Sequence, residues 1–274
     1  PNDLTAVGNT LYFNADDGTH GDELWKSDGT ASGTVMVKDI GNAGSNGDPG
    51  WLTAVGNTLY FQADSGTYGA ELWKSDGTAS GTVLVQDINS GTSGSSAHEF
   101  VLMDNTIYFS ARDGTHGDEL WALDPANITG LSSGSTSSTC IGTACMVKDI
   151  NASGNSFNVY PPFMVTVGNT LYFVAEDGTN GKELWKSDGT ASGTVMVKDI
   201  NSNGDGFHLY NRLMALGNNT YFFADDGTNG LELWRTDGTT SGTEMVENIG
   251  PGSASGINGG RNLGTMGNAL YFVA

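Results

Sequence analysis

The sequence is poor in cysteine, in proline and in basic residues. Its 274 residues include two cysteines and six prolines, and eleven lysines and arginines stand against 31 acidic residues, giving a formal charge of −20. This negative charge disfavours nucleic acid and anionic membranes as partners. No stretch approaches the roughly 18 apolar residues of a membrane span, so we expect no membrane insertion. No signal segment is recognisable at Pro1, so a secretion signal would lie outside this sequence.

Helical periodicity is also missing. Residues 10–15 place Leu11, Phe13 and Ala15 on one face of an extended segment, and residues 35–40 are rich in β-branched side chains. The 41 glycines supply tight turns. These features predict an all-β protein with one sizeable core.

Five near-copies of one motif run through the chain, each with Glu-Leu-Trp and four of them with Asp-Gly-Thr close behind. The motif tryptophans are separated by 48, 48, 64 and 49 positions; they are Trp25, Trp73, Trp121, Trp185 and Trp234. A period of about 40–50 residues is typical of a four-stranded propeller blade. The sequence therefore predicts an all-β β-propeller built from blades of about 48 residues, with five complete units and a half unit.

The predicted units form a single repeat domain over residues 1–274. They cover residues 4–50, 51–98, 99–160, 161–210 and 211–260, the half unit covers 261–274, and an insertion over 124–145 lengthens the third unit. The first pair of strands recurs six times and the second pair five times. We expect that the natural protein continues past Ala274, that five blades close and leave a hairpin over, or that a neighbouring chain completes the sixth unit.

The motif resembles that of the bacterial tandem-repeat proteins named for ELWxxDGT. The resemblance covers nearly the whole chain and is specific in four units, at residues 23–30, 71–78, 183–190 and 232–239. The third unit departs from it after Trp121, where the chain reads Ala-Leu-Asp124-Pro125. The resemblance implies an extracellular protein with a β-propeller-like or related all-β array, and it implies no particular biochemical activity.

An acidic loop recurs between the second and third strands of each unit. Closely spaced carboxylates suit calcium. The candidate metal ligands are Asp16, Asp17, Glu23, Asp64, Glu71, Asp113, Glu119, Glu176, Asp177, Glu183, Asp225, Asp226 and Glu232. Ser65 and Arg112 replace acidic residues in the second and third units, and we expect those sites to be the weakest. The alternative interpretation is a hairpin loop in which Asp and Thr side chains bind backbone amides.

Two further features point to recognition. The position after Gly-Thr in the acidic loop varies and supplies candidate ligand-binding residues, namely His20, Tyr68, His116, Asn180 and Asn229. The loops between units also diverge and carry Trp51, Phe100, Phe157, Tyr160, Phe207 and Tyr210, which either contact a ligand or fill gaps between blades. The motif tryptophans are expected to pack between blades, with sugar stacking as the alternative.

The two cysteines, Cys140 and Cys145, lie within the insertion, and we predict a disulfide bond between them with two free thiols as the alternative. A disulfide favours an oxidising compartment, and hence an extracellular or cell-surface location. The insertion contains no histidine, and two cysteines alone do not make a structural zinc site.

No catalytic motif is recognisable, and we predict that the protein is not an enzyme. The four histidines are scattered outside known metal or nucleophile motifs, and the prominent acidic residues recur in every unit, whereas active sites are usually asymmetric. We predict an extracellular structural or adhesive module with calcium as a stabilising ion. Its partner would be a glycan or protein on a cell surface or in the extracellular matrix, or further copies of itself. A lectin-like glycan-binding propeller is the alternative, and a secreted hydrolase the third interpretation.

Overall fold

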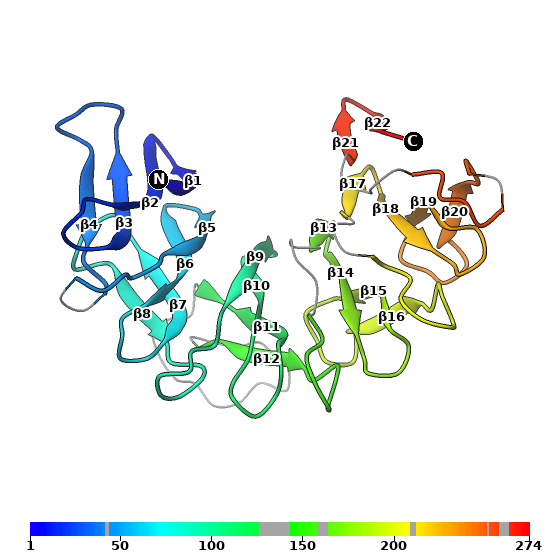
Figure 1. The fold of residues 1–274 in the computed structure, drawn as a ribbon, viewed down its shortest axis with the longest axis horizontal. Helices are drawn as coiled ribbons and strands as arrows, with labels where there is room; N and C mark the ends of the chain where they lie inside the picture. Colours follow the sequence, from blue (N-terminus) through cyan, green and yellow to red (C-terminus); the bar gives the residue numbers. More distant parts are fainter. Residues whose placement is uncertain (42–43, 126–142, 158–163, 209–211, 251, 258–262) are drawn as a thin grey trace.

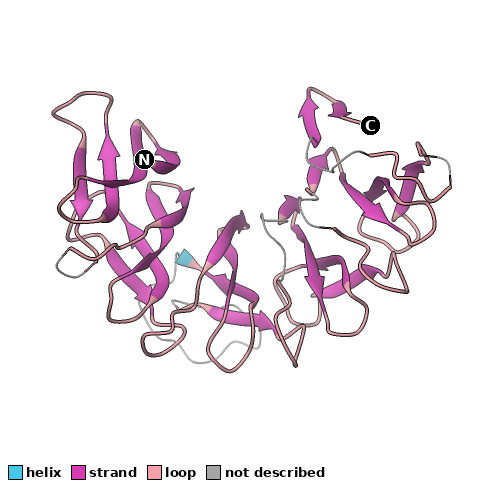
Figure 2. Cartoon of the chain, viewed as in Figure 1, coloured by secondary structure: helices cyan, strands magenta, loops and turns pink. Residues whose placement is uncertain are grey.

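The computed structural model describes residues 1–41, 44–125, 143–157, 164–208, 212–250, 252–257 and 263–274. Over these ranges the chain forms 22 β-strands and no α-helix, and a short 3-10 turn at Pro125 is the helical piece drawn in Figure 2. No helix in the described residues is long and apolar enough to cross a membrane. The strands make five four-stranded antiparallel sheets, one in each repeat unit, and a final two-stranded sheet. The predicted all-β class is confirmed.

Each sheet is a meander in which neighbouring strands pair in chain order. The first unit contains β1 (Asn2–Val7), β2 (Thr10–Asp16), β3 (Asp22–Ser27) and β4 (Val35–Lys38). The second contains β5 (Gly50–Val55), β6 (Thr58–Asp64), β7 (Ala70–Ser75) and β8 (Val83–Gln86). The third contains β9 (His98–Met103), β10 (Thr106–Ala111), β11 (Glu119–Leu123) and β12 (Cys145–Lys148).

The remaining units follow the same order. The fourth contains β13 (Val165–Val167), β14 (Thr170–Glu176), β15 (Lys182–Ser187) and β16 (Val195–Lys198). The fifth contains β17 (Met214–Leu216), β18 (Asn219–Asp225), β19 (Leu231–Thr236) and β20 (Glu244–Glu247), and the last sheet pairs β21 (Leu263–Met266) with β22 (Ala269–Phe272). In the third unit the third strand ends at Leu123, so the connection to β12 spans residues 124–144.

The six sheets follow one another around an open arc (Figure 1). The first strand of each sheet lies on the inner side of the arc and next to the first strand of the following sheet, from β1 and β5 to β17 and β21. The fourth strands lie on the outer side, and the two chain ends lie on opposite sides of the opening. This arrangement is propeller-like, and the described residues form an arc rather than a closed ring.

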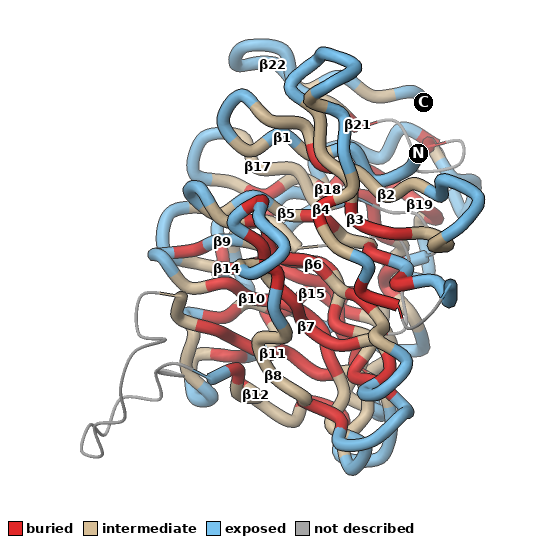
Figure 3. The backbone as a smooth tube through the Cα atoms, turned by 90° about the vertical axis from the view of Figure 1, so that its left-hand side faces the viewer, coloured by how far each residue is buried: buried red, intermediate tan, exposed pale blue. Residues whose placement is uncertain are grey.

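The apolar core lies between successive sheets. Tyr12, Leu24 and Ile40 of the first unit pack with Phe61 and Trp73 of the second, and the same combination recurs along the arc. Figure 3 shows the buried residues concentrated in the middle strands of the units, such as β6, β7, β10, β11 and β15. Each unit therefore completes the core of its neighbour, as in other repeat proteins.

The motif tryptophans occupy equivalent places in this core. Trp73, Trp121, Trp185 and Trp234 are 6–7% exposed, and each packs with residues of the preceding unit. Trp25 of the first unit is half-buried. The predicted packing role of the tryptophans is confirmed for these four, and it leaves their rings unavailable for sugar stacking.

Candidate functional site

The five motif glutamates, which we define as Glu23, Glu71, Glu119, Glu183 and Glu232, have no exposed surface. Each carboxylate accepts hydrogen bonds from backbone amides of the loop that leads to the next unit. Glu183 accepts from the amides of Ile200, Asn201 and Gly206 at 2.9, 3.3 and 3.0 Å. A buried carboxylate requires such partners, and here they fix the connecting loop to the third strand.

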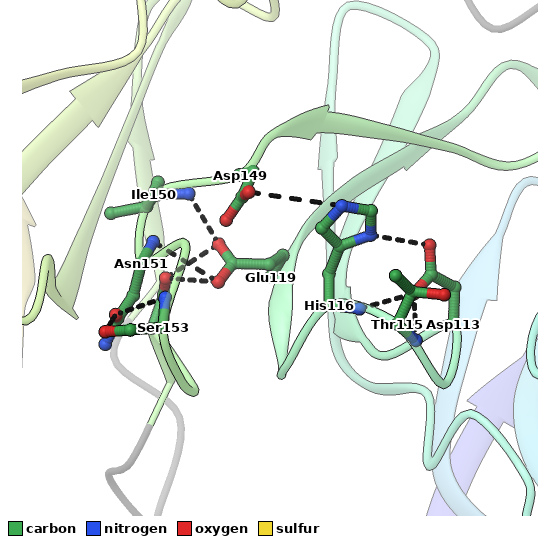
Figure 4. A network of polar contacts seen from close by, with 9 residues as sticks. Asp113, Thr115, His116, Glu119, Asp149, Ile150, Asn151 and Ser153 are labelled. Carbon is green, nitrogen blue, oxygen red and sulfur yellow. Dashed lines mark hydrogen bonds and ion pairs between the residues drawn. The ribbon is translucent and has the colours of Figure 1, made fainter.

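Glu119 shows the same arrangement at the third unit (Figure 4). Its carboxylate accepts from the Ile150 amide at 2.8 Å and from the Ser156 hydroxyl at 2.6 and 2.7 Å. Burial raises the pKa of Glu23, Glu71, Glu119 and Glu183, and the hydrogen bonds oppose this shift; the pKa of Glu183 reaches about 7. The motif glutamates therefore hold loops through backbone amides.

The acidic loops form turns through their own side chains. Asp17 Oδ1 accepts from the amides of Thr19 and His20 at 2.9 and 3.0 Å, and Asp113, Asp177 and Asp226 make the equivalent bonds in later units. The pKa of Asp17 is lowered by its hydrogen bonds with the His20 side chain and with these amides. At Asp113, Asp177 and Asp226 burial raises the pKa, but hydrogen bonds from the amides and from the side chain three residues on outweigh it and lower the pKa. Asp16, Asp64 and Asp225 each cap the amide of the loop glycine two residues on.

The candidate calcium ligands do not come together around one point. In the residues that the structure describes, no group of three or more His, Cys, Asp or Glu side chains is placed to hold a metal ion. Glu23 and its equivalents bind the inter-unit loop, whereas Asp17 and its equivalents bind their own turn. The geometry matches the turn interpretation, and calcium binding stays a prediction.

The variable position of the acidic loop pairs with the turn aspartate. His20 Nδ1 lies 2.8 Å from Asp17 Oδ2 and His116 Nδ1 lies 2.9 Å from Asp113 Oδ2 (Figure 4), while Asn180 and Asn229 donate to their aspartates at 2.8 and 2.7 Å. In the second unit Ser65 stands in place of the aspartate, and Tyr68 is 40% exposed. Four of the five candidate ligand-binding residues therefore complete a turn.

The aromatic residues that we predicted in the inter-unit loops divide into two groups, and two of them, Trp51 and Phe100, lie instead in the first strands β5 and β9. Phe100, Phe157 and Phe207 are buried and lie against a phenylalanine of a second strand, with ring centroids 5.2–5.6 Å apart. These three fill gaps between the sheets. Trp51 is half-buried and lines a cavity, and Tyr160 and Tyr210 lie outside the described residues.

The cavity at Trp51, which we call the axial cavity, has a volume of about 360 Å³ and is lined mainly by residues of the first strands. It is bounded by the first strands of the first three units and by Met164, just before β13. Its polar and aromatic lining comes from Asp3, Thr5, Trp51, Thr53, Glu99 and Phe100. Glu99 is 3% exposed, whereas Asp3 is exposed.

Three of these lining residues share an unusual backbone conformation. Asp3, Trp51 and Glu99 have φ values of 53°, 58° and 62°, and each lies at a β-bulge two residues before the strand residue that pairs with the tyrosine of the next strand. Non-glycine residues in this region cost about 1–3 kcal/mol each and gather at ligand-binding sites. The bulge supplies three different side chains to one cavity.

The lining residues Asp3 and Glu99 are absent from the predicted sites. The repeat comparison singled out positions where carboxylates recur, and this position holds a different residue in each unit. The sequence did show that this repeat position on the first strand holds Asp, Trp and Glu in the first three units, and this variation could have identified the site. A cavity of this size with an aromatic ring and a few polar groups is typical of a small-ligand site.

The predicted disulfide falls partly outside the described residues. Cys145 is the first residue of β12, but Cys140 lies outside the described ranges. The bond between them stays a prediction.

Comparison with known proteins identifies the fold alone. No protein-family model matches the chain, and no curated protein matches it either. A computationally designed protein, Ika8, is similar with a TM-score of 0.51 and 20% identity over 97% of this chain and 65% of its own. A puromycin hydrolase S511A mutant complexed with PGG matches with a TM-score of 0.54 and 13% identity, over 89% of this chain and 36% of its own.

A structure from a study of two prolyl endopeptidases matches with a TM-score of 0.53 and 10% identity, over 98% of this chain and 38% of that chain. These likenesses support a β-propeller-like fold. This chain spans less than two thirds of the length of each of these proteins.

Proposed function

We propose that the chain is a binding module whose axial cavity takes a neutral sugar residue of a glycan. The observation that carries this proposal is the meeting of Trp51, Asp3 and Glu99 in one cavity of about 360 Å³. An indole ring offers a flat apolar face for the C–H side of a sugar ring. Carboxylates act as acceptors for sugar hydroxyls, each of which is also a donor.

The charge of the chain restricts the ligand class. With a formal charge of −20 and two carboxylates in the cavity lining, an anionic ligand would be repelled. Thr5 and Thr53 add hydroxyl groups to the lining; the Thr5 hydroxyl also donates to the Leu52 carbonyl at 2.9 Å, which ties the first unit to the second. A rigid, repeated scaffold limits the entropy lost on binding.

The test is a titration of the protein with a panel of neutral oligosaccharides, followed by tryptophan fluorescence and calorimetry. We expect saturable binding that Trp51→Ala abolishes and that Asp3→Asn weakens. Tyr68→Ala is the matched control, because Tyr68 is an exposed aromatic residue of an acidic loop and does not line the axial cavity. Binding that is lost with Tyr68→Ala and kept with Trp51→Ala would place recognition in the acidic loops and contradict the proposal.

The setting of this module is part of the proposal. We propose an extracellular propeller-type repeat protein of the ELWxxDGT kind that acts in adhesion and is not an enzyme. The structural role of the motif supports this proposal: in each unit the glutamate binds the inter-unit loop, and the buried tryptophans pack between sheets. Carboxylates engaged in this way are structural in every unit. Immunolabelling of intact source cells tests the location.

A further inference from the structure

The contact between successive units includes a tyrosine and a lysine that meet the Asp-Gly turn of the next unit. Lys26 Nζ donates to the carbonyl of Gly77 at 2.8 Å, and Lys186 Nζ donates to that of Gly238 at 2.8 Å. A methyl group on Gly77, Gly189 or Gly238 would clash with the hydroxyl of Tyr12, Tyr108 or Tyr172. The turn thus fits directly onto the preceding unit.

The second unit presents the same surface, but the third unit lacks the Asp-Gly-Thr motif in its sequence. Tyr60 pairs with Lys74 across β6 and β7, as Tyr12 pairs with Lys26 across β2 and β3. In the third unit the motif turn is replaced after Leu123 by Asp124-Pro125. Within the described ranges, neither the ammonium of Lys74 nor the hydroxyl of Tyr60 has a hydrogen-bond partner.

A cavity occupies this place. It has a volume of about 380 Å³ and is lined by Tyr60, Lys74, Asp76, Ser80, Val83 and Pro125, among others. We call it the inter-unit cavity. Tyr60 is 2% exposed, whereas Asp76, Ser80 and Val83 are exposed, so the cavity reaches the solvent.

The pKa values of the tyrosines agree with a missing turn. Burial raises the pKa of Tyr12, Tyr60 and Tyr172. The carboxylate of the neighbouring turn, Asp76 or Asp237, raises the pKa of Tyr12 and Tyr172 further, and Tyr60 has burial alone.

We propose that the inter-unit cavity is a peptide-binding site for a turn of the Asp-Gly-Thr type. The glycine carbonyl of the peptide accepts from Lys74 Nζ, and the glycine itself lies against the Tyr60 hydroxyl. The reason is that Tyr60 and Lys74 keep the arrangement that receives this turn elsewhere in the same molecule. The site is distinct from the axial cavity, since the two share no lining residue.

The probe is the blocked peptide Ser-Asp-Gly-Thr-Ala-Ser-Gly-Thr, which copies residues 187–194. Its binding to the intact chain is followed by NMR, with the same peptide carrying Val in place of the first glycine as a second probe. We expect saturable binding, and a loss of at least about tenfold for Lys74→Met, because a hydrogen bond to a charged group is removed. Tyr60→Phe should weaken binding less, and the Val peptide should fail to bind.

Lys186→Met is the matched control, because Lys186 Nζ is already bonded to Gly238 inside the chain. It should leave the affinity for the peptide unchanged, and far-ultraviolet circular dichroism should show that all variants are folded. No saturable binding by the wild-type chain would overturn the proposal, as would equal binding by Lys74→Met or by the Val peptide. Occupation of the cavity by other residues of the chain would appear as the first of these results.

Discussion

Replacing Gln86 with lysine tests how the units recognise one another. At the equivalent position, Lys38, Lys148 and Lys198 donate at 2.8 Å to a carbonyl of the following unit and lie 5.5–5.8 Å from the centroid of its motif tryptophan. The second unit has Gln86 instead, and its Oε1 accepts from the Ala144 amide at 2.8 Å. The hydrogen bond therefore runs in the opposite direction at this one contact.

Gln86→Lys would place an ammonium against an amide, and both groups are donors. Loss of the bond and of a partner for the Ala144 amide, which belongs to a residue only 4% exposed, should cost about 1–3 kcal/mol. A new contact between the ammonium and Trp121 would return about 0.5–1 kcal/mol. The expected net loss of unfolding free energy is about 1–2 kcal/mol.

The reverse exchange, Lys38→Gln, is the matched control. A glutamine amide can still donate to the Thr82 carbonyl, so only the charge and the contact with Trp73 are lost, at a cost of about 0.5–1 kcal/mol. Urea unfolding followed by tryptophan fluorescence measures both variants, with m values checked for equality. A Gln86→Lys chain as stable as the wild type, or more stable, would refute the donor and acceptor argument.

Three further outcomes are expected. The pKa of Glu183 is raised from 4.5 to about 7, so its protonated form stabilises the folded chain. This stabilisation is fully present below pH 4.5 and is lost as the pH rises towards 7, a change in unfolding free energy on the order of 3 kcal/mol. Glu183→Gln should flatten this fall in urea-unfolding profiles, and an unchanged slope would contradict the prediction. Calcium bound in the acidic loops would raise Tm, by about 2.7 kcal/mol of stability per site at a hundredfold excess over Kd, and Asp226→Asn should reduce that rise; equal Tm in calcium and in EDTA argues against calcium. Protein isolated without reductant should have the mass of a Cys140–Cys145 disulfide, and two thiols that react with an alkylating reagent without prior reduction would disprove it.

The strand pattern and the packing of the motif tryptophans could be predicted from the sequence. Alternation of apolar residues and a repeat of about 48 positions are sufficient to predict four-stranded units, because each strand must bury one face against its neighbour. A tryptophan recurs at the position of Trp185 in every copy, which predicts a core residue, and the Trp185 side chain is 6% exposed in the structure. These inferences depend on period and apolarity alone.

The roles of the carboxylates were harder to predict. Glu183 lies six residues after Asp177 in sequence, which suggested one oxygen cluster, yet its oxygens meet the amides of Ile200 and Gly206 from the following loop. A sequence pattern shows where carboxylates occur, but it does not show which hydrogen-bond donors they contact in the folded chain. The axial cavity was missed for a related reason, since it depends on the left-handed backbone at Trp51 and Glu99, a conformation that neither residue type favours.

Some departures from the repeat change a contact between units. Gln86 accompanies the change of partner from a carbonyl to the Ala144 amide, and Ser65 accompanies Tyr68 in the one acidic loop without a turn aspartate. At Gln86 the side-chain acceptor meets a backbone donor, so a hydrogen bond between the units is kept. Tyr60 and Lys74 are different: the sequence motif of the turn that meets their equivalents, Tyr12 and Lys26, is replaced in the third unit, and both residues are retained. Both residues line a cavity that reaches the solvent, and a turn of the kind that meets Tyr12 and Lys26 would pair there with the Lys74 ammonium.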